Sequence, residues 1–160
     1  MKKMQGLWTT LAWLGMAACS AEPNERTTKT VEFTLLAQGT QSGVESQRFE
    51  VIRDEGALRS VWQAHAHATT PAQGPPKVDF QTAMVIAAYA GTKSSGGYRL
   101  DIEKISQDGD RLEVSMVLTQ PGADCFVSEV MTQPYVMATT PRSSQSVHFT
   151  LSTNISKCEQ

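Results

Sequence analysis

The sequence predicts a mainly β domain, either an antiparallel sandwich or a barrel-like sheet, with one docked α-helix. Short segments in which apolar and polar residues alternate recur at even intervals, which is typical of strands with one face in a core. Only residues 54–66 have the apolar spacing of an amphipathic helix. The pair Asp108-Gly109 lies between two alternating segments and indicates a β-hairpin. These observations favour a β-rich α+β fold.

The N-terminus has the pattern of an export signal. Lys2 and Lys3 precede the apolar residues 7–14, and small residues then lead to Cys19. This segment resembles a bacterial lipoprotein signal, which implies that Cys19 is acylated, with palmitate for example, and becomes the mature N-terminus. The alternative is an ordinary signal peptide in which Cys19 is incidental. Ser20, rather than an aspartate, follows the cysteine, which favours the outer membrane over the inner one if the cell has both.

We therefore expect three parts: a signal peptide over residues 1–18, a lipid-anchored flexible tether over 19–30, and one domain over 31–160. The tether residues are mostly polar and show no periodicity. Loss of the two signal lysines lowers the 14 basic residues to 12, against 16 acidic ones. The absence of a basic patch argues against a nucleic-acid partner. We expect the membrane to be contacted through the lipid anchor.

The first half of the domain contains two predicted strands. Residues 31–37 alternate in polarity, with Val31, Phe33 and Leu35 on the expected buried face. Residues 48–53 form a second short strand.

The predicted helix over residues 54–66 begins at Asp54, whose carboxylate can cap it. Its apolar stripe consists of Leu58, Val61, Trp62 and His65. We expect Trp62 to anchor the helix on the sheet. The three prolines within residues 69–77 exclude a helix or a central strand there and predict a loop.

Residues 83–90 are wholly apolar and predict a central strand covered on both faces. A glycine-rich segment, residues 91–98, follows, and alternation resumes over residues 98–103. We interpret this region as a strand, a turn and a second strand forming a hairpin, with the rest of the chain arranged around it.

The second half of the domain continues with strands. Residues 112–118 alternate after the turn at 107–110, and this hairpin is the clearest structural signal in the chain. Residues 126–131 are also expected to form a strand. Pro134 begins a further strand, where its missing N–H is tolerated. A last strand covers residues 147–151.

Two cysteines remain once Cys19 is assigned to lipid. Cys125 and Cys158 lie in an exported chain, where disulfides persist, so we expect them to be bonded to each other. The bond would hold a C-terminus that otherwise frays. Cys125 with His148 as a nucleophile and base is the alternative, but no third orienting group is evident.

Other patterns do not favour catalysis or metal binding. His65 and His67 are two residues apart, so they would not share a helix face, and two imidazoles are too few for a metal site. Ser94 and Ser95 lack the Gly-x-Ser-x-Gly pattern of hydrolases. We interpret Asp108 and Asp110, on either side of Gly109, as turn residues, although two carboxylates at this spacing could bind calcium weakly. We expect no enzyme activity, no cofactor and no metal.

The glycine-rich segment is the predicted partner-binding loop. Gly96 and Gly97 permit positive φ, and one interpretation gives them a purely conformational role in a tight turn. The functional interpretation is that a backbone without side chains lets a partner approach, while polar neighbours supply contacts. The predicted contact residues are Lys93, Ser94, Ser95, Gly96, Gly97 and Tyr98.

Three local patterns, taken in order, resemble the C-terminal domain of the protease complex subunit PrcB, which occurs in exported bacterial proteins. They are residues 91–98, the Pro-Gly-Ala-Asp-Cys loop at 121–125 and the Gln-Pro-Tyr-Val segment at 133–136. The resemblance extends from about residue 31 to the end of the chain. Ser95 stands where that family more often has threonine. The resemblance implies a non-catalytic partner in a protease complex.

The expected function is that of a lipid-anchored, extracytoplasmic protein-interaction module, an accessory or modulator of an envelope or secreted protease complex. One alternative is a loop-inserting protease inhibitor, since the Gly-Tyr turn also resembles the Thr-Thr-Gly-Tyr loop of chagasin-like inhibitors. The other inhibitory loops of that family have no counterpart here. A second alternative is a module that binds a small ligand or the cell envelope.

Overall fold

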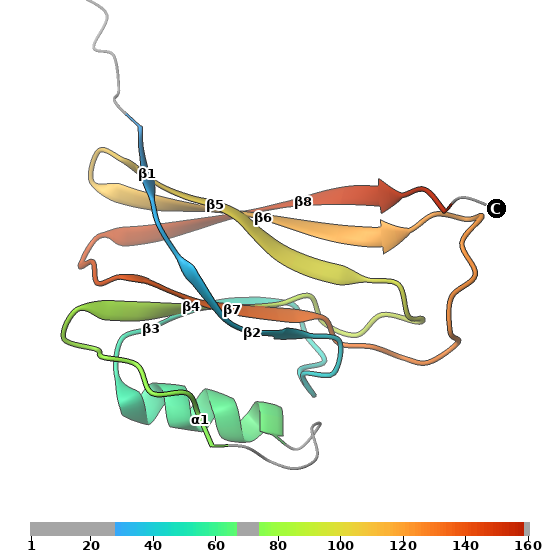
Figure 1. The fold of residues 1–160 in the computed structure, drawn as a ribbon, viewed down its shortest axis with the longest axis horizontal. Coiled ribbons are helices and arrows are strands. Elements are labelled where there is room, and N and C mark those ends of the chain that lie inside the picture. Colours follow the sequence, from blue (N-terminus) through green and yellow to red (C-terminus); the bar gives the residue numbers. More distant parts are fainter. Residues whose placement is uncertain (1–27, 67–73, 159–160) are drawn as a thin grey trace, which may run out of the picture.

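The computed structural model describes residues 28–66 and 74–158 and shows two four-stranded sheets packed face to face (Figure 1). One helix covers the outer face of the lower sheet in that view. The elements are β1 (Lys29–Val31), β2 (Thr34–Gly39), β3 (Arg48–Ile52), α1 (Glu55–Ala66), β4 (Ala83–Tyr89), β5 (Arg99–Asp108), β6 (Arg111–Pro121), β7 (Tyr135–Pro141) and β8 (Ser146–Ser156). The predicted β-rich α+β sandwich is confirmed, and the sheets do not close into a barrel.

Sheet A has the strand order β1-β5-β6-β8, and sheet B has the order β2-β7-β4-β3. Every pair of neighbouring strands is antiparallel except β6 and β8, which are parallel. The exception arises because the chain leaves sheet A after β6, forms β7 in sheet B, and returns to sheet A as β8. The predicted hairpin at Asp108-Gly109 is confirmed, since Asp108 pairs with Arg111.

Strand β4 is buried on both faces, as its apolar sequence predicts. Met84, Ile86 and Ala88 belong to the core between the two sheets, whereas Val85 and Tyr89 belong to the core beneath α1. All five side chains have no exposed surface. The alternation of a strand therefore places β4 in two cores at once.

Helix α1 is capped as predicted, with the Ala57 backbone N–H donating to Asp54 Oδ1 at 2.8 Å. Leu58 is only 1% exposed and is the side chain that enters the core, whereas Trp62 is half-buried and packs at its margin. Trp62 therefore contacts the core beneath the helix, as expected, but Leu58 is the helix residue that is fully buried there. No helix among the described residues has the length and apolar content to cross a membrane.

The prediction of one strand over residues 31–37 is wrong, because the chain changes sheets within this segment. Strand β1 ends at Val31 in sheet A, and β2 begins at Thr34 in sheet B. A register shift between Leu35 and Ala37 then leaves the Leu35 side chain 51% exposed. Leu36 packs in the core beneath α1 in its place.

Residues 74–77, the described part of the predicted proline-rich loop, contain no regular secondary structure. The rest of that loop, His67, the signal peptide, Cys19 and most of the tether lie outside the described residues.

Candidate functional site

Residues 91–98 connect the two sheets, so they do not form the turn of a hairpin. The segment begins after β4, whose neighbours in sheet B are β3 and β7, and it ends at β5, whose neighbours in sheet A are β1 and β6. The hairpin interpretation is therefore wrong. The strands on either side do not bond to each other, because they belong to different sheets.

Backbone hydrogen bonds fix this connection against residues 126–133. Lys93 and Thr132 exchange two bonds, with N···O distances of 2.7 Å and 3.0 Å. The Gly96 N–H donates to the Ser128 carbonyl at 2.9 Å. On the other side, the Thr92 N–H donates to the Glu45 carbonyl at 2.9 Å. The connection is thus held at several points along its length.

The side chains of the predicted contact residues differ in how much they are exposed to solvent. Ser94 is exposed, whereas Lys93 and Ser95 are half-buried. The Thr132 hydroxyl donates to the Ser95 carbonyl at 2.8 Å, which ties Ser95 to its neighbours. Tyr98 packs against the core between the sheets and therefore serves the scaffold. Lys93 and Ser94 remain the polar groups that a partner could reach.

The two glycines of the connection have different roles. Gly97 has φ 85°, as predicted, and a side chain there would also meet Val127 Cγ1 at 2.8 Å. Gly96 is not among the glycines with positive φ, so that part of the prediction is wrong. Its added Cβ would lie 2.5 Å from Ser128 Oγ, so the side chain of Ser128 limits that position.

Residues 126–131 do not form the predicted strand. The segment is irregular, and three of its apolar side chains point into solvent: Phe126 is fully exposed, Val130 is 57% exposed and Met131 is 64% exposed. Apolar residues in a short run predicted a strand, but residues 126–131 join neither sheet, and Ser128 instead accepts a backbone bond from Gly96 of the connection. The sequence pattern therefore did not predict that these three apolar side chains are exposed on the surface.

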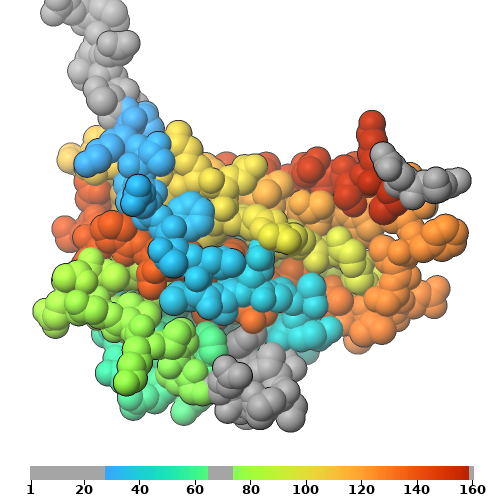
Figure 2. Space-filling view, in the orientation of Figure 1, coloured from blue at the N-terminus to red at the C-terminus, as the bar shows by residue number. Residues whose placement is uncertain are grey.

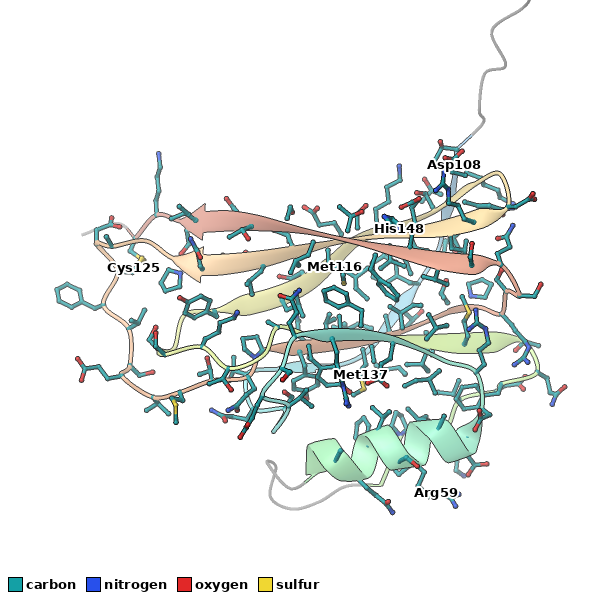
Figure 3. The ribbon with its side chains drawn as sticks, turned by 180° about the vertical axis from the view of Figure 1, so that it is seen from behind. Arg59, Asp108, Met116, Cys125, Met137 and His148 are labelled. Atoms are coloured by element: carbon teal, nitrogen blue, oxygen red, sulfur yellow. A yellow bond between two sulfur atoms is a disulfide. The ribbon has the colours of Figure 1, made fainter. Side chains whose placement is uncertain are left out.

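The Cys125–Cys158 disulfide is present, with a Cα–Cα distance of 5.2 Å. It joins residues 122–131 to the segment just after β8, where the Gly122 N–H also donates to the Ser156 carbonyl at 3.0 Å. Figure 3 labels Cys125 at one end of the sandwich and His148 well away from it along β8. The structure therefore does not bring Cys125 and His148 together as a nucleophile and base.

A third segment, residues 40–47, completes this end of the molecule. The Gln133 N–H donates to the Thr40 carbonyl at 2.8 Å, and the Ser42 N–H donates to the Gln133 carbonyl at 3.1 Å. We call residues 40–47, 91–98 and 122–133 the loop end. Figure 2 shows these segments, in cyan, yellow-green and orange, gathered on the right side of the molecule.

The loop end lies at the opposite end of the sandwich from the start of the described chain. Lys29 of β1 pairs with Gln107, near the tip of the β5–β6 hairpin, whereas Arg99 at the other end of β5 adjoins residues 91–98. Figure 1 shows the chain entering at the upper left and the loop end at the right. A groove at the margin of the loop end is lined by Gln38, Gly39, Thr40, Gly97, Tyr98 and Arg99.

The titratable groups with shifted pKa values belong to the scaffold. Burial raises the pKa of Tyr89 and also that of Tyr135 above the ordinary tyrosine range. The guanidinium of Arg48 lies 5.2 Å from the centre of the Tyr89 ring, a cation–π contact. Among the described residues, no group of three or more His, Cys, Asp or Glu side chains could hold a metal ion.

Comparison with known protein families gives a match in the second half of the domain. The family model described as PrcB C-terminal matches residues 84–141, from β4 to the end of β7. The matched region contains both the connection at 91–98 and the segment at 122–133. No curated protein matches the chain. No solved structure matches it either.

Proposed function

Residues 84–141 place this chain in the PrcB C-terminal family, and from this premise we propose that it is a lipid-anchored, extracytoplasmic subunit that binds a protease complex through its loop end. The family points to association with a protease complex and therefore to a protein partner. The proposal adds the anchor at Cys19, the location in the cell envelope, with the outer membrane favoured, and the surface that makes the contact. It gives the chain no catalytic role.

The exposed apolar side chains of the loop end carry this proposal. Phe126, Val130 and Met131 lie within six residues of one another, and each exposes more than half of its surface. Several exposed large apolar groups on one surface segment are candidates for an interaction site, and aromatic side chains often contribute most of the binding energy. Lys93 and Ser94 lie on the neighbouring connection and could add polar contacts at the margin.

The loop end is also held in place before a partner arrives. Backbone bonds join residues 126–133 to residues 91–98 and to residues 40–42, and the disulfide fixes the segment at Cys125. A surface that is already ordered loses less conformational entropy on binding.

Replacing Phe126, Val130 and Met131 together with serine should reduce capture of the protease from envelope membranes by tenfold or more, about the effect of losing one strong anchor. Stability should change little, since exposed residues contribute little to it. Leu35→Ser is the matched control, because Leu35 is also an exposed apolar side chain but lies on β2. Lys93→Glu with Ser94→Ala tests, in the same assay, whether these two residues add polar contacts to the protease.

The protease activity in these captures separates the alternatives. An accessory subunit preserves or raises activity, and an inhibitor lowers it. A ligand-binding module captures no protease at all. If the triple serine variant folds and captures protease as well as wild type does, the loop end is not the contact surface.

Cys19→Ala should leave the protein uncleaved or release it from the membrane fraction, because the thiol that carries the acyl chains is gone. Membrane fractionation and mass spectrometry of the mature N-terminus measure the effect. An unacylated wild-type protein beginning after Cys19 would contradict the anchor.

A further inference from the structure

Strand β8 forms a long open edge of sheet A. It pairs with β6 over eleven residues in a continuous register without a shift. No other strand of the described chain pairs with its second side. Figure 3, which views the molecule from behind, shows β8 running along the sandwich in front of β6, with no element drawn over it. Its outer side therefore offers unpaired backbone N–H and C=O groups.

The other edges of the two sheets carry features that limit pairing with another chain. Strand β1 is only three residues long, and β3 has five residues and carries the Arg48–Glu50 ion pair. Strand β2 has a register shift, and its Gln38 side chain donates to the Leu100 carbonyl at 2.7 Å. Short length, charges and bulges are the usual means of protecting an edge. Strand β8 contains no proline, lysine, arginine or acidic residue.

The side chains of β8 alternate regularly. Val147, Phe149 and Leu151 pack against the core between the sheets but remain half-buried. Further along the same face, Ile155 is 60% exposed. The alternate positions, which include His148 and Asn154, are exposed on the outer face. A strand added beside β8 would cover these core-facing side chains if it had apolar residues at every second position. Strand β8 itself has this pattern.

We propose that two copies of this chain pair through β8, antiparallel, to form one continuous eight-stranded sheet. A two-fold axis at Leu151 gives the register in which all eleven residues are paired, Ser146 with Ser156 of the second copy and so on. This register sets the exposed Ile155 opposite Val147 and sets Phe149 opposite Thr153. His148, the one ionisable residue of the strand, meets Asn154, so no like charges face each other.

The paired strand contains none of the residues proposed to contact the protease. Phe126, Val130 and Met131 precede β7 in the chain and are not part of β8. The dimer surface and the surface proposed for the protease partner can therefore be tested separately.

The register gives a sharp test in the full-length protein purified in detergent. His148→Lys with Asn154→Lys places two like-charged pairs across the two-fold axis. His148→Lys with Asn154→Asp places two opposite-charged pairs at the same positions and serves as the matched control. Light scattering and sedimentation measure the mass of the protein component, and thermal unfolding checks that both variants fold.

We expect wild type to be a dimer and the Lys-Lys variant to dissociate at protein concentrations at least about tenfold higher than the Lys-Asp variant does, given the usual strength of cross-strand charge pairs. A monomeric wild type would overturn the proposal. The same result would be found if the edge of β8 binds a strand of another protein instead of a second copy. Equal dissociation of the two variants would also overturn it, because the β8 register predicts opposite signs for their interactions.

Discussion

Replacing Cys125 and Cys158 with alanine should lower the free energy of unfolding by roughly 3–4 kcal/mol, the chain-entropy value for a closed loop of this size. The two residues are bonded and lie 33 positions apart. The closed loop contains all of β7 and β8, so the bond restricts a large part of the unfolded chain. Denaturant unfolding of the oxidised wild type and the double variant measures the difference.

Reduction provides the control for this prediction. Wild-type protein treated with a thiol reductant should lose about as much stability as the double alanine variant, and the variant itself should not respond to reductant. Residues 122–131, which have no strand pairing, should show faster amide exchange in both cases. If oxidised and reduced wild type unfold at the same denaturant concentration, the bond does not stabilise the fold.

Gly91→Ala should also destabilise the domain strongly, by roughly 2–5 kcal/mol. Gly91 has φ 74°, a conformation that costs other residues about 1–2 kcal/mol. An added Cβ would in addition lie 2.9 Å from both Gln47 N and Glu45 O. These are backbone atoms that cannot rotate away, so we expect a further roughly 1–3 kcal/mol from overpacking. Thermal or denaturant unfolding measures the loss.

Gly109 is the matched control for Gly91. It has φ 59° in the β5–β6 hairpin, and nothing lies within 4 Å of a Cβ added there. Gly109→Ala should therefore show only the conformational cost of positive φ, about 1–2 kcal/mol. The difference between the two variants isolates the collision with residues 45–47. If Gly91→Ala and Gly109→Ala lose the same free energy of unfolding, residues 45–47 move away from the added Cβ at no energetic cost.

The sequence by itself determined the features that depend on local pattern. The unbroken apolar run of β4 required cover on both faces, and the structure supplies sheet A on one side and α1 on the other. The Asp108-Gly109 pair located the β5–β6 hairpin, and Asp54 located the start of α1. With Cys19 predicted to carry lipid, Cys125 and Cys158 were the one pair left, and the structure bonds them to each other.

Tertiary structure decided which sheet each strand joins and which apolar residues stay in solvent. Alternation at residues 31–37 looks the same whether a strand continues or crosses between sheets, so the division into β1 and β2 was not visible. Residues 91–98 were predicted to be the turn of a hairpin, but β4 and β5 lie in different sheets. Phe126 was predicted to be part of a strand, yet its segment pairs with neither sheet and its side chain is fully exposed. The physical reason is that side-chain pattern reports local burial, whereas the backbone hydrogen bonds of a strand are made with residues distant in the sequence, which the local pattern does not identify.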